Sequence, residues 1–176
     1  WLQSTYIDVT RYVIFAVGVW IVLWGILGRP LAGRRIRPSR PPLRQLAVEF
    51  LVSIRSVAVF YTVGLATFFM DRAGWMAGPE IAKSLGPIWF WVSLALMIIA
   101  HDAWFYWTHR LIHRPGLFRP LHRRHHTSHN PSPFTAYSFD LGEAAIQAAF
   151  VPLYTLIVPT PWAVVGLFMI HQIVRN

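Results

Sequence analysis

Apolar residues of this chain gather in long runs that are separated by shorter polar or basic stretches. Tyr12–Leu27 contains no charged residue, and with its flanks it reaches the ~20 residues that a helix needs to cross a bilayer. We interpret Leu43–Arg55 as the interfacial start of a second helix, which continues into the uncharged Ser56–Met70. A third apolar run begins with Ile88–Ala100 and continues through HDAWFYWTHRLIH without a break. These runs predict membrane helices, with Asp71–Pro87 as the loop before the last of them.

The C-terminal part has a different pattern, because its two apolar runs are each short for a full span. These runs are Ala144–Val158 and Trp162–Val174, so that a hairpin dipping into the membrane and two spans both remain open. Before them lies a polar, basic stretch rich in histidine and proline, which begins where Pro115 and Gly116 end the preceding helix. The pattern predicts an all-α integral membrane protein, a bundle of about four spanning or partly spanning helices.

Composition supports a membrane protein and narrows its chemistry. The chain is 55% apolar and 13% charged, whereas an ordinary soluble domain is about 45–50% apolar and 25% charged. The absence of cysteine from the sequence excludes disulfides, thiolate-ligated haem, iron–sulfur clusters and cysteine zinc sites. Any bound metal must therefore use histidine or carboxylate ligands.

The net charge of +9 comes from sixteen basic and seven acidic residues. In a soluble protein this excess would indicate nucleic acid, but here six arginines lie in Arg29–Arg44 and five in Arg110–Arg124, next to apolar runs. This placement is typical of cytoplasmic loops and of contacts with lipid headgroups. We expect no nucleic-acid partner, and we expect the loops Gly28–Pro42 and Arg114–Asp140 to share the cytoplasmic side.

The chain begins with Trp1 and ends in an apolar stretch, so we interpret it as a fragment of a longer protein. It forms one membrane domain over residues 1–176. We expect residues 1–100 to be membrane helices and loops, and residues 101–176 to be a histidine-rich region whose C-terminal part is missing.

Seven of the eight histidines fall within residues 101–129. His109 and His113 differ by about 40° and one turn on an ideal helix, so both can bind one metal. The second group has the form HxxHH and consists of His122, His125 and His126. Its spacings of three and four residues place the imidazole of His122 beside those of His125 and His126. On one helix, imidazoles that point in these different directions can bind two metals. The pattern predicts a dinuclear metal site at the cytoplasmic end of the helices, whereas a headgroup-binding surface has no use for this spacing.

Other residues are weaker candidates. Asp102 has about the azimuth of His109 and His113 and could accept an N–H from a ligand histidine, although it could equally pair with an arginine. Glu143 could play the same part or could be an acid at a helix N-terminus. Three further possible metal ligands are His101, His129 and His171. Each has an alternative: His101 could be a helix histidine near the interface, His129 a loop histidine, and His171 a hydrogen-bonded core residue.

The residues from His101 to His113 resemble the HDxxxYWxHRxxH signature of the fatty acid hydroxylase/sterol desaturase superfamily, and HRRHH resembles its second histidine box. NPSPFTAYSF also resembles the segment that follows that box. The resemblance implies an integral membrane, iron-dependent oxygenase or desaturase with eight or more histidines around two metals, and it implies that the five histidines of the two boxes are ligands. Two departures stand out: Asp140 replaces a family histidine, and a later HxxHH box is absent. His171 could belong to the family's intervening histidine set.

We therefore expect a membrane-bound di-iron oxidoreductase that hydroxylates or desaturates a lipid C–H bond of a sterol, fatty acyl chain or related lipid. Its cofactor would be two non-haem irons, and it would act on a lipid of the bilayer with O₂. We expect a separate electron donor, because the sequence has no dinucleotide, flavin or haem signature. The alternative is a membrane metal- or haem-binding protein without oxygenase activity. A zinc hydrolase ranks below both because HExxH is absent. With five strongly spaced histidines, we expect the chain alone to bind metal incompletely.

Overall fold

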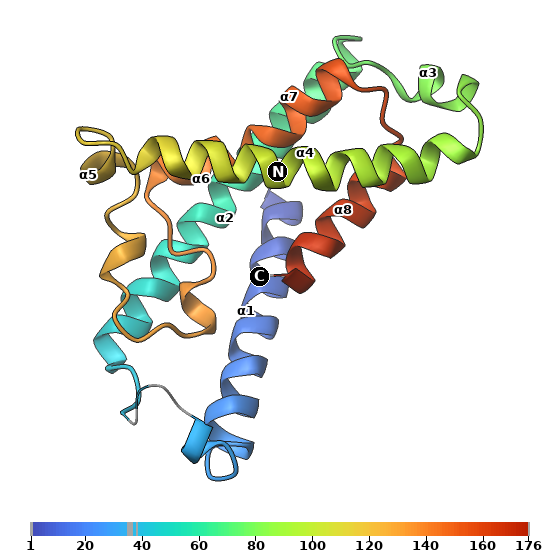
Figure 1. The fold of residues 1–176 in the computed structure, drawn as a ribbon. Helices are drawn as coiled ribbons and strands as arrows, with labels where there is room; N and C mark the ends of the chain where they lie inside the picture. Colours follow the sequence, from blue (N-terminus) through green and yellow to red (C-terminus); the bar gives the residue numbers. More distant parts are fainter. Residues whose placement is uncertain (1, 35–36, 38, 176) are drawn as a thin grey trace. The chain divides into compact units, whose positions relative to one another are not determined.

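The computed structural model describes residues 2–34, 37 and 39–175, and these residues form helices and loops with no strand among them. Three helical segments are long and apolar enough to cross a membrane: Val9–Ile26, Leu43–Arg72 and Ile88–Ile112. Two shorter apolar segments follow at Leu141–Ile157 and Trp162–Arg175. The predicted all-α membrane fold is confirmed (Figure 1).

The first apolar run forms helix α1 (Leu2–Trp20), which continues into the π-helical segment η1 (Ile21–Ile26). A short 3-10 helix, η2 (Ala32–Arg34), follows in the basic loop. The helical stretch therefore includes the predicted Tyr12–Leu27 span almost entirely.

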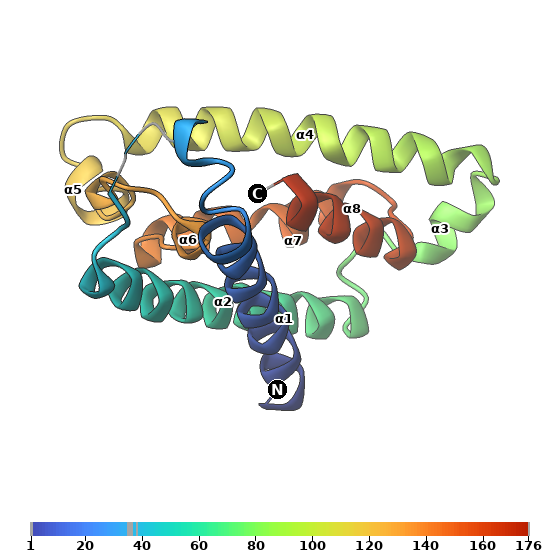
Figure 2. The ribbon, with the colours of Figure 1, turned by 90° about the horizontal axis from the view of Figure 1, so that it is seen from below.

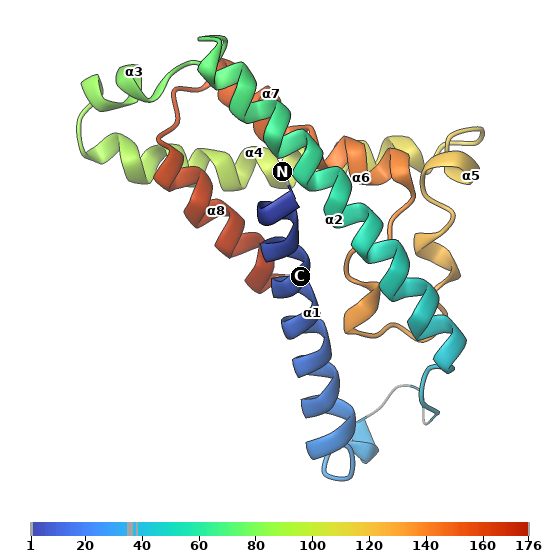
Figure 3. The same cartoon turned by 180° about the vertical axis from the view of Figure 1, so that it is seen from behind.

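The second helix, α2 (Leu43–Arg72), is one uninterrupted element, as Figure 3 shows. The predicted interfacial start and the predicted span therefore share a single helix. Both of its interior charges have partners: Glu49 is buried among hydroxyl groups, and Arg55 donates to the carbonyl of Phe139 at 2.6 Å. A charged residue with such partners can be buried at much lower free-energy cost.

The loop predicted for Asp71–Pro87 contains the short helix α3 (Pro79–Ser84). Helix α4 (Ile88–Ile112) then runs through the first histidine box, as predicted, and His113 is its C-terminal cap. The turn that follows contains Gly116 at φ +89°, a backbone conformation that residues with a side chain rarely adopt.

All remaining elements are short except the last helix. They are α5 (Phe118–Leu121), η3 (His125–Thr127), η4 (Pro133–Thr135), α6 (Leu141–Ala148), α7 (Phe150–Ile157) and α8 (Trp162–Arg175). The two predicted C-terminal apolar runs thus correspond to α6 with α7 and to α8, separated by a break at residues 158–161.

The chain forms two compact units, each made of two stretches of sequence. Unit 1 comprises Trp1–Tyr61 and Phe118–Ala144, and its core contains Tyr12, Ala16, Val57 and Phe134. Unit 2 comprises Thr62–Leu117 and Ala145–Asn176. Its core is formed by buried residues of α4, α7 and α8, namely Met97, Phe150, Tyr154, Val164, Val165 and Phe168. Figure 2 shows α7 and α8 running beside α4 within this unit.

Candidate metal centre

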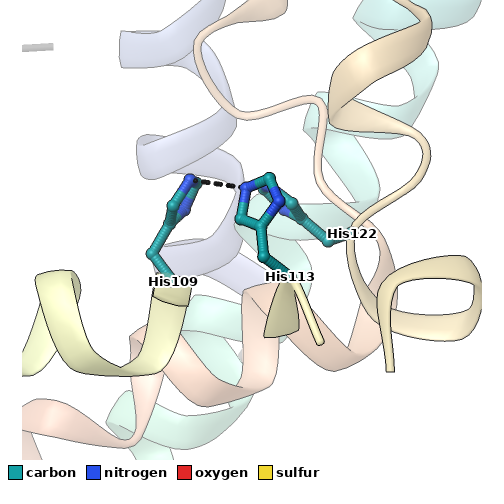
Figure 4. Close-up of side chains that lie close together, drawn as sticks. All are labelled: His109, His113 and His122. Carbon is teal, nitrogen blue, oxygen red and sulfur yellow. Dashed lines mark hydrogen bonds between the residues drawn. The ribbon is translucent and has the colours of Figure 1, made fainter. Parts of the chain in front are cut away.

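The first histidine box lies at the C-terminal end of α4, in unit 2. The Nε2 atoms of His109 and His113 are 3.2 Å apart, and their ring centroids are 4.8 Å apart (Figure 4). Two imidazole nitrogens that bind one metal at 2.0–2.1 Å stand about 2.9–3.4 Å apart for ligand angles between octahedral and tetrahedral. The pair therefore fits two ligands of one metal ion, and the proximity predicted from the four-residue spacing is confirmed.

The second box lies in unit 1, where its three imidazole rings gather around His122. The ring centroid of His122 is 5.3 Å from that of His125 and 4.7 Å from that of His126. The rings are as close as the HxxHH spacing predicts, but the prediction that one helix carries them is wrong. Helix α5 ends at Leu121, and after a turn His125 and His126 begin the 3-10 helix η3.

A side chain binds the backbone donor at the beginning of η3. The N–H of Arg124 donates to Oδ2 of Asp140 at 2.9 Å, so it does not continue an α-helical hydrogen-bond ladder. The Arg124 guanidinium also lies 3.7 Å from Oδ1 of Asp140. Asp140, noted in the sequence as a departure from the family pattern, thus fixes the beginning of η3.

Glu143 of α6 lies against the second box from inside unit 1. Its Oε2 is 2.9 Å from Nδ1 of His122, and both side chains are buried. Burial, with a smaller contribution from the charge of Asp140, raises the pKa of Glu143 to about 8. A carboxyl group that accepts the Nδ1–H of an imidazole fixes the ring and leaves Nε2 as the ligand atom. Glu143 also lies in the first turn of α6, so its position agrees with both alternatives that the sequence leaves open.

Glu49 of α2 is a residue that the sequence analysis did not single out. Its buried carboxylate accepts hydrogen bonds from Ser128, Ser132 and Thr135, which follow the second box in the chain. An acidic residue in the interior of a long apolar helix indicates that polar groups must pair with it when it is buried. The sequence alone does not identify those groups.

The weaker candidates of unit 2 lie around α8. His101 packs its ring against Phe150 and Phe168, with centroids 5.0 and 5.2 Å away. The Nε2 of Gln172 is 3.4 Å from Nδ1 of His101 and 3.5 Å from Nδ1 of His171, so one amide lies between two histidines.

Asp102 pairs with an arginine, which was the second of its two possible roles. It pairs with Arg175 and lies 3.9 Å from Nδ1 of His101. Its suggested contact with a ligand histidine of the first box stays a prediction. His129 of unit 1 is exposed in the loop after η3.

An open apolar groove of about 460 Å³ lies between α4 and α7 in unit 2. Its lining residues are Ala100, Ala103, Trp104, Trp107, Thr108, Leu111, Phe150, Leu153, Tyr154 and Ile157. The hydroxyl of Thr108 donates to the carbonyl of Trp104 at 2.7 Å, so even this polar group is satisfied locally. The helical period places the α4 residues of the groove on the side of the helix away from His109. The groove suits hydrocarbon, but it does not lead directly to the first histidine box.

An all-helical membrane protein with histidines at metal-ligand spacing is the class that this fold and these side chains define. Residues 94–176 match the family model described as fatty acid hydroxylase. No solved structure matches the chain.

Curated relatives carry related names. The chain is 27% identical over 112 residues to the Delta(7)-sterol 5(6)-desaturase ERG3B of Gibberella zeae, a match that covers 64% of this chain and 28% of that protein. It is 27% identical over 135 residues to the lathosterol oxidase of Rattus norvegicus, covering 73% of this chain and 44% of that one. A shorter match of 38 residues at 37% identity joins it to fatty acid hydroxylase domain-containing protein 2 of Homo sapiens, covering 22% and 11%.

Residues 94–176 match the fatty acid hydroxylase family, and the relatives are named as sterol desaturases or oxidases, so the predicted resemblance of the two histidine boxes to the fatty acid hydroxylase/sterol desaturase superfamily is confirmed. The names of the family model and of these relatives are those of oxidoreductases. The chain spans less than half the length of each of these relatives.

Proposed function

We propose that the chain carries the histidine-box region of a membrane-bound di-iron oxidoreductase that hydroxylates or desaturates a lipid C–H bond. The observation that carries this proposal is the 3.2 Å separation of the Nε2 atoms of His109 and His113, within a family of lipid-modifying enzymes. The relatives named for sterol desaturation and lathosterol oxidation support a lipid substrate such as a sterol or a fatty acyl chain.

The proposed ligands are the five histidines of the two boxes: His109, His113, His122, His125 and His126. Only eight residues separate the first box from the second in the chain, which supports one shared centre. Three further histidines would complete the coordination of two ions: His101, His129 and His171. Neutral imidazoles suit iron, and the donor set contains no thiolate.

The chain's own residues prepare the ligands. The carboxyl group of Glu143 lies 2.9 Å from Nδ1 of His122, which places it to fix the ring orientation of this proposed ligand. The apolar faces of the helices keep the bound lipid chain away from water. Two iron ions in such a site would supply the oxidising power, taken from O₂, that an unactivated C–H bond requires. The electrons come from a separate reductase or electron carrier, since the sequence offers no binding motif for a nicotinamide or flavin.

We further propose that the metal centre is on the cytoplasmic side. The basic residues of the loops 28–42 and 114–140 support this orientation. Within unit 1 the Nδ2 of Asn130 donates to the carbonyl of Ser39 at 2.9 Å, which supports a common side for the two loops. Single cysteines introduced at the exposed positions Ser39 and Thr127 should both be labelled from the cytoplasmic side, whereas labelling from opposite sides would contradict the orientation.

Metal analysis of the purified protein, combined with a visible spectrum and product mass spectrometry, tests the proposed function. We expect about two non-haem irons per intact protein and an oxidised lipid that forms only with O₂ and a reductase. A Soret band would instead identify a haem protein, and one zinc without iron would identify a zinc protein. Either result would overturn the proposal.

A further inference from the structure

The carboxylate of Glu49 accepts two hydrogen bonds on each of its oxygens. Oε1 accepts from Gln45 Nε2 at 2.8 Å and from Ser128 Oγ at 2.6 Å. Oε2 accepts from Thr135 Oγ1 at 2.9 Å and from Ser132 Oγ at 3.2 Å. A carboxylate has about four lone-pair positions, so these donors use its whole acceptor capacity.

The donors lie in the loop that follows the second histidine box. Ser128 is the C-terminal cap of η3 and comes two residues after His126. Ser132 and Thr135 form the capping box of η4, in which Ser132 Oγ accepts from the N–H of Phe134 and Thr135 Oγ1 accepts from the N–H of Ser132. The carboxylate therefore joins the end of η3 to the beginning of η4, and it anchors both to α2.

The short helix that carries two proposed ligands is thus held at both ends by acids. Asp140 binds the N–H of Arg124, which precedes η3, and Glu49 binds Ser128, which follows it. A 3-10 helix of three residues has too few internal hydrogen bonds to keep its own conformation. Its side chains take their direction from these two anchors.

We propose that Glu49 is a positioning residue for the metal centre, which orients His125 and His126 by fixing the loop from Ser128 to Thr135. The proposal rests on the proposed function, because it concerns ligands of that centre. Glu49 does not need to touch the metal for this role, since its four acceptor positions are taken by the loop and by Gln45.

A carboxylate suits this position better than any neutral side chain. Four donors converge on Glu49, and a glutamine there would offer one oxygen and turn an NH₂ group towards two of them. Bonds to a charged acceptor are also shorter and stronger than bonds between neutral groups. The substitution Glu49→Gln therefore keeps the size of the side chain and weakens its hold on η3 and η4, because the charge and one acceptor oxygen are lost.

Ser53→Ala provides a matched control from the same helix. The hydroxyl of Ser53 is buried and donates to the carbonyl of Phe134 at 2.8 Å, so it also ties α2 to the loop. The Ser53 hydrogen bond goes to η4 and not to the end of η3. Its loss should lower stability without redirecting the imidazoles, which separates a positioning role from a merely structural one.

The test compares wild-type, E49Q and S53A proteins in detergent by amide hydrogen exchange and by Co²⁺ titration. In E49Q we expect exchange over residues 125–135 to be at least about 10-fold faster in the metal-free protein. We also expect about 10-fold weaker Co²⁺ binding and a changed cobalt absorption spectrum, a range typical of losing an outer partner of metal ligands. In S53A we expect the wild-type spectrum and an affinity close to that of wild type.

Unchanged exchange and an unchanged cobalt spectrum in E49Q would overturn the inference. Equal spectral changes in E49Q and S53A would also overturn it, because any loosening of the loop would then have the same effect. If the wild-type protein bound no Co²⁺, the proposed metal centre and the role of Glu49 in it would both fail. The exchange measurement would still decide whether Glu49 holds the loop.

Discussion

The two histidine boxes are held in place by different means. His109 and His113 occupy the end of one regular helix, and a spacing of four residues brings their nitrogens together. The rings of the second box gather although the backbone beneath them changes from α-helix to turn to 3-10 helix. There Glu49, Asp140 and Glu143 provide the order that a helix would otherwise supply.

The difference shows what each box needs from the rest of the protein. The first needs backbone hydrogen bonds that form within its own helix. The second uses three of the chain's seven acidic residues, and one of them comes from a helix more than seventy positions earlier. The second box should therefore be the more sensitive of the two to substitutions that leave every histidine intact.

The largest effect should come from removing a histidine of either box. His109→Ala and His125→Ala should each abolish lipid oxidation and release at least one metal ion, because a missing ligand cannot be replaced by a neighbour. Product mass spectrometry and metal analysis of membrane-inserted protein measure both quantities. Turnover retained in either variant would rule out that histidine as a ligand.

A smaller loss should follow from removing the partner of a ligand. Glu143→Ala should weaken metal binding by about 10- to 100-fold, since His122 then loses the carboxyl group that lies beside its Nδ1. Glu143→Gln keeps an acceptor oxygen and should lose less. Competition titrations with Co²⁺ give the affinities, and equal affinities for the alanine variant and the wild type would contradict the role of Glu143.

The anchor at the beginning of η3 should contribute measurably to stability. Asp140→Ala removes the acceptor of the Arg124 N–H and should lower the free energy of unfolding by about 1 kcal/mol, as the loss of a cap does. Asp140→Asn keeps an acceptor and should stay close to the wild type. Denaturant unfolding in detergent compares the two, and an equal loss in both would assign the effect to the ion pair instead.

The smallest effect should come from the exposed loop histidine. His129→Ala should change the free energy of unfolding by less than about 0.5 kcal/mol, as exposed substitutions usually do. A role as an eighth ligand would show itself as a loss of iron in this variant. Iron analysis beside the His125→Ala protein therefore decides whether His129 belongs to the centre.

Sequence patterns were sufficient where structure is local. The apolar runs predicted the long helices, and the spacing of four predicted the contact between His109 and His113, because both depend on the helical period. The same period predicted the grouping of the second box but not its backbone. The N–H of Arg124 is bonded to Asp140, and no rule of spacing brings that carboxylate to it.

The partners of the buried acids were also beyond the sequence. Nothing in the neighbourhood of Glu49 identifies Ser128 as its donor, since 79 positions separate the two residues. Glu143 was a candidate for such a contact, but its partner His122 became clear only from the fold. Contacts between distant segments are decided by tertiary packing, which periodicity does not describe.

The discontinuity of unit 1 has a consequence for biosynthesis. Tyr12, Ala16 and Val57 share their core with Phe134, which the ribosome adds 77 residues after Val57. Since a chain is synthesised at about 5–20 residues per second, several seconds pass between the synthesis of α2 and that of Phe134. During that interval the buried carboxylate of Glu49 also lacks its three hydroxyl donors. The core of unit 1 can therefore be completed only after residues 118–144 have been synthesised.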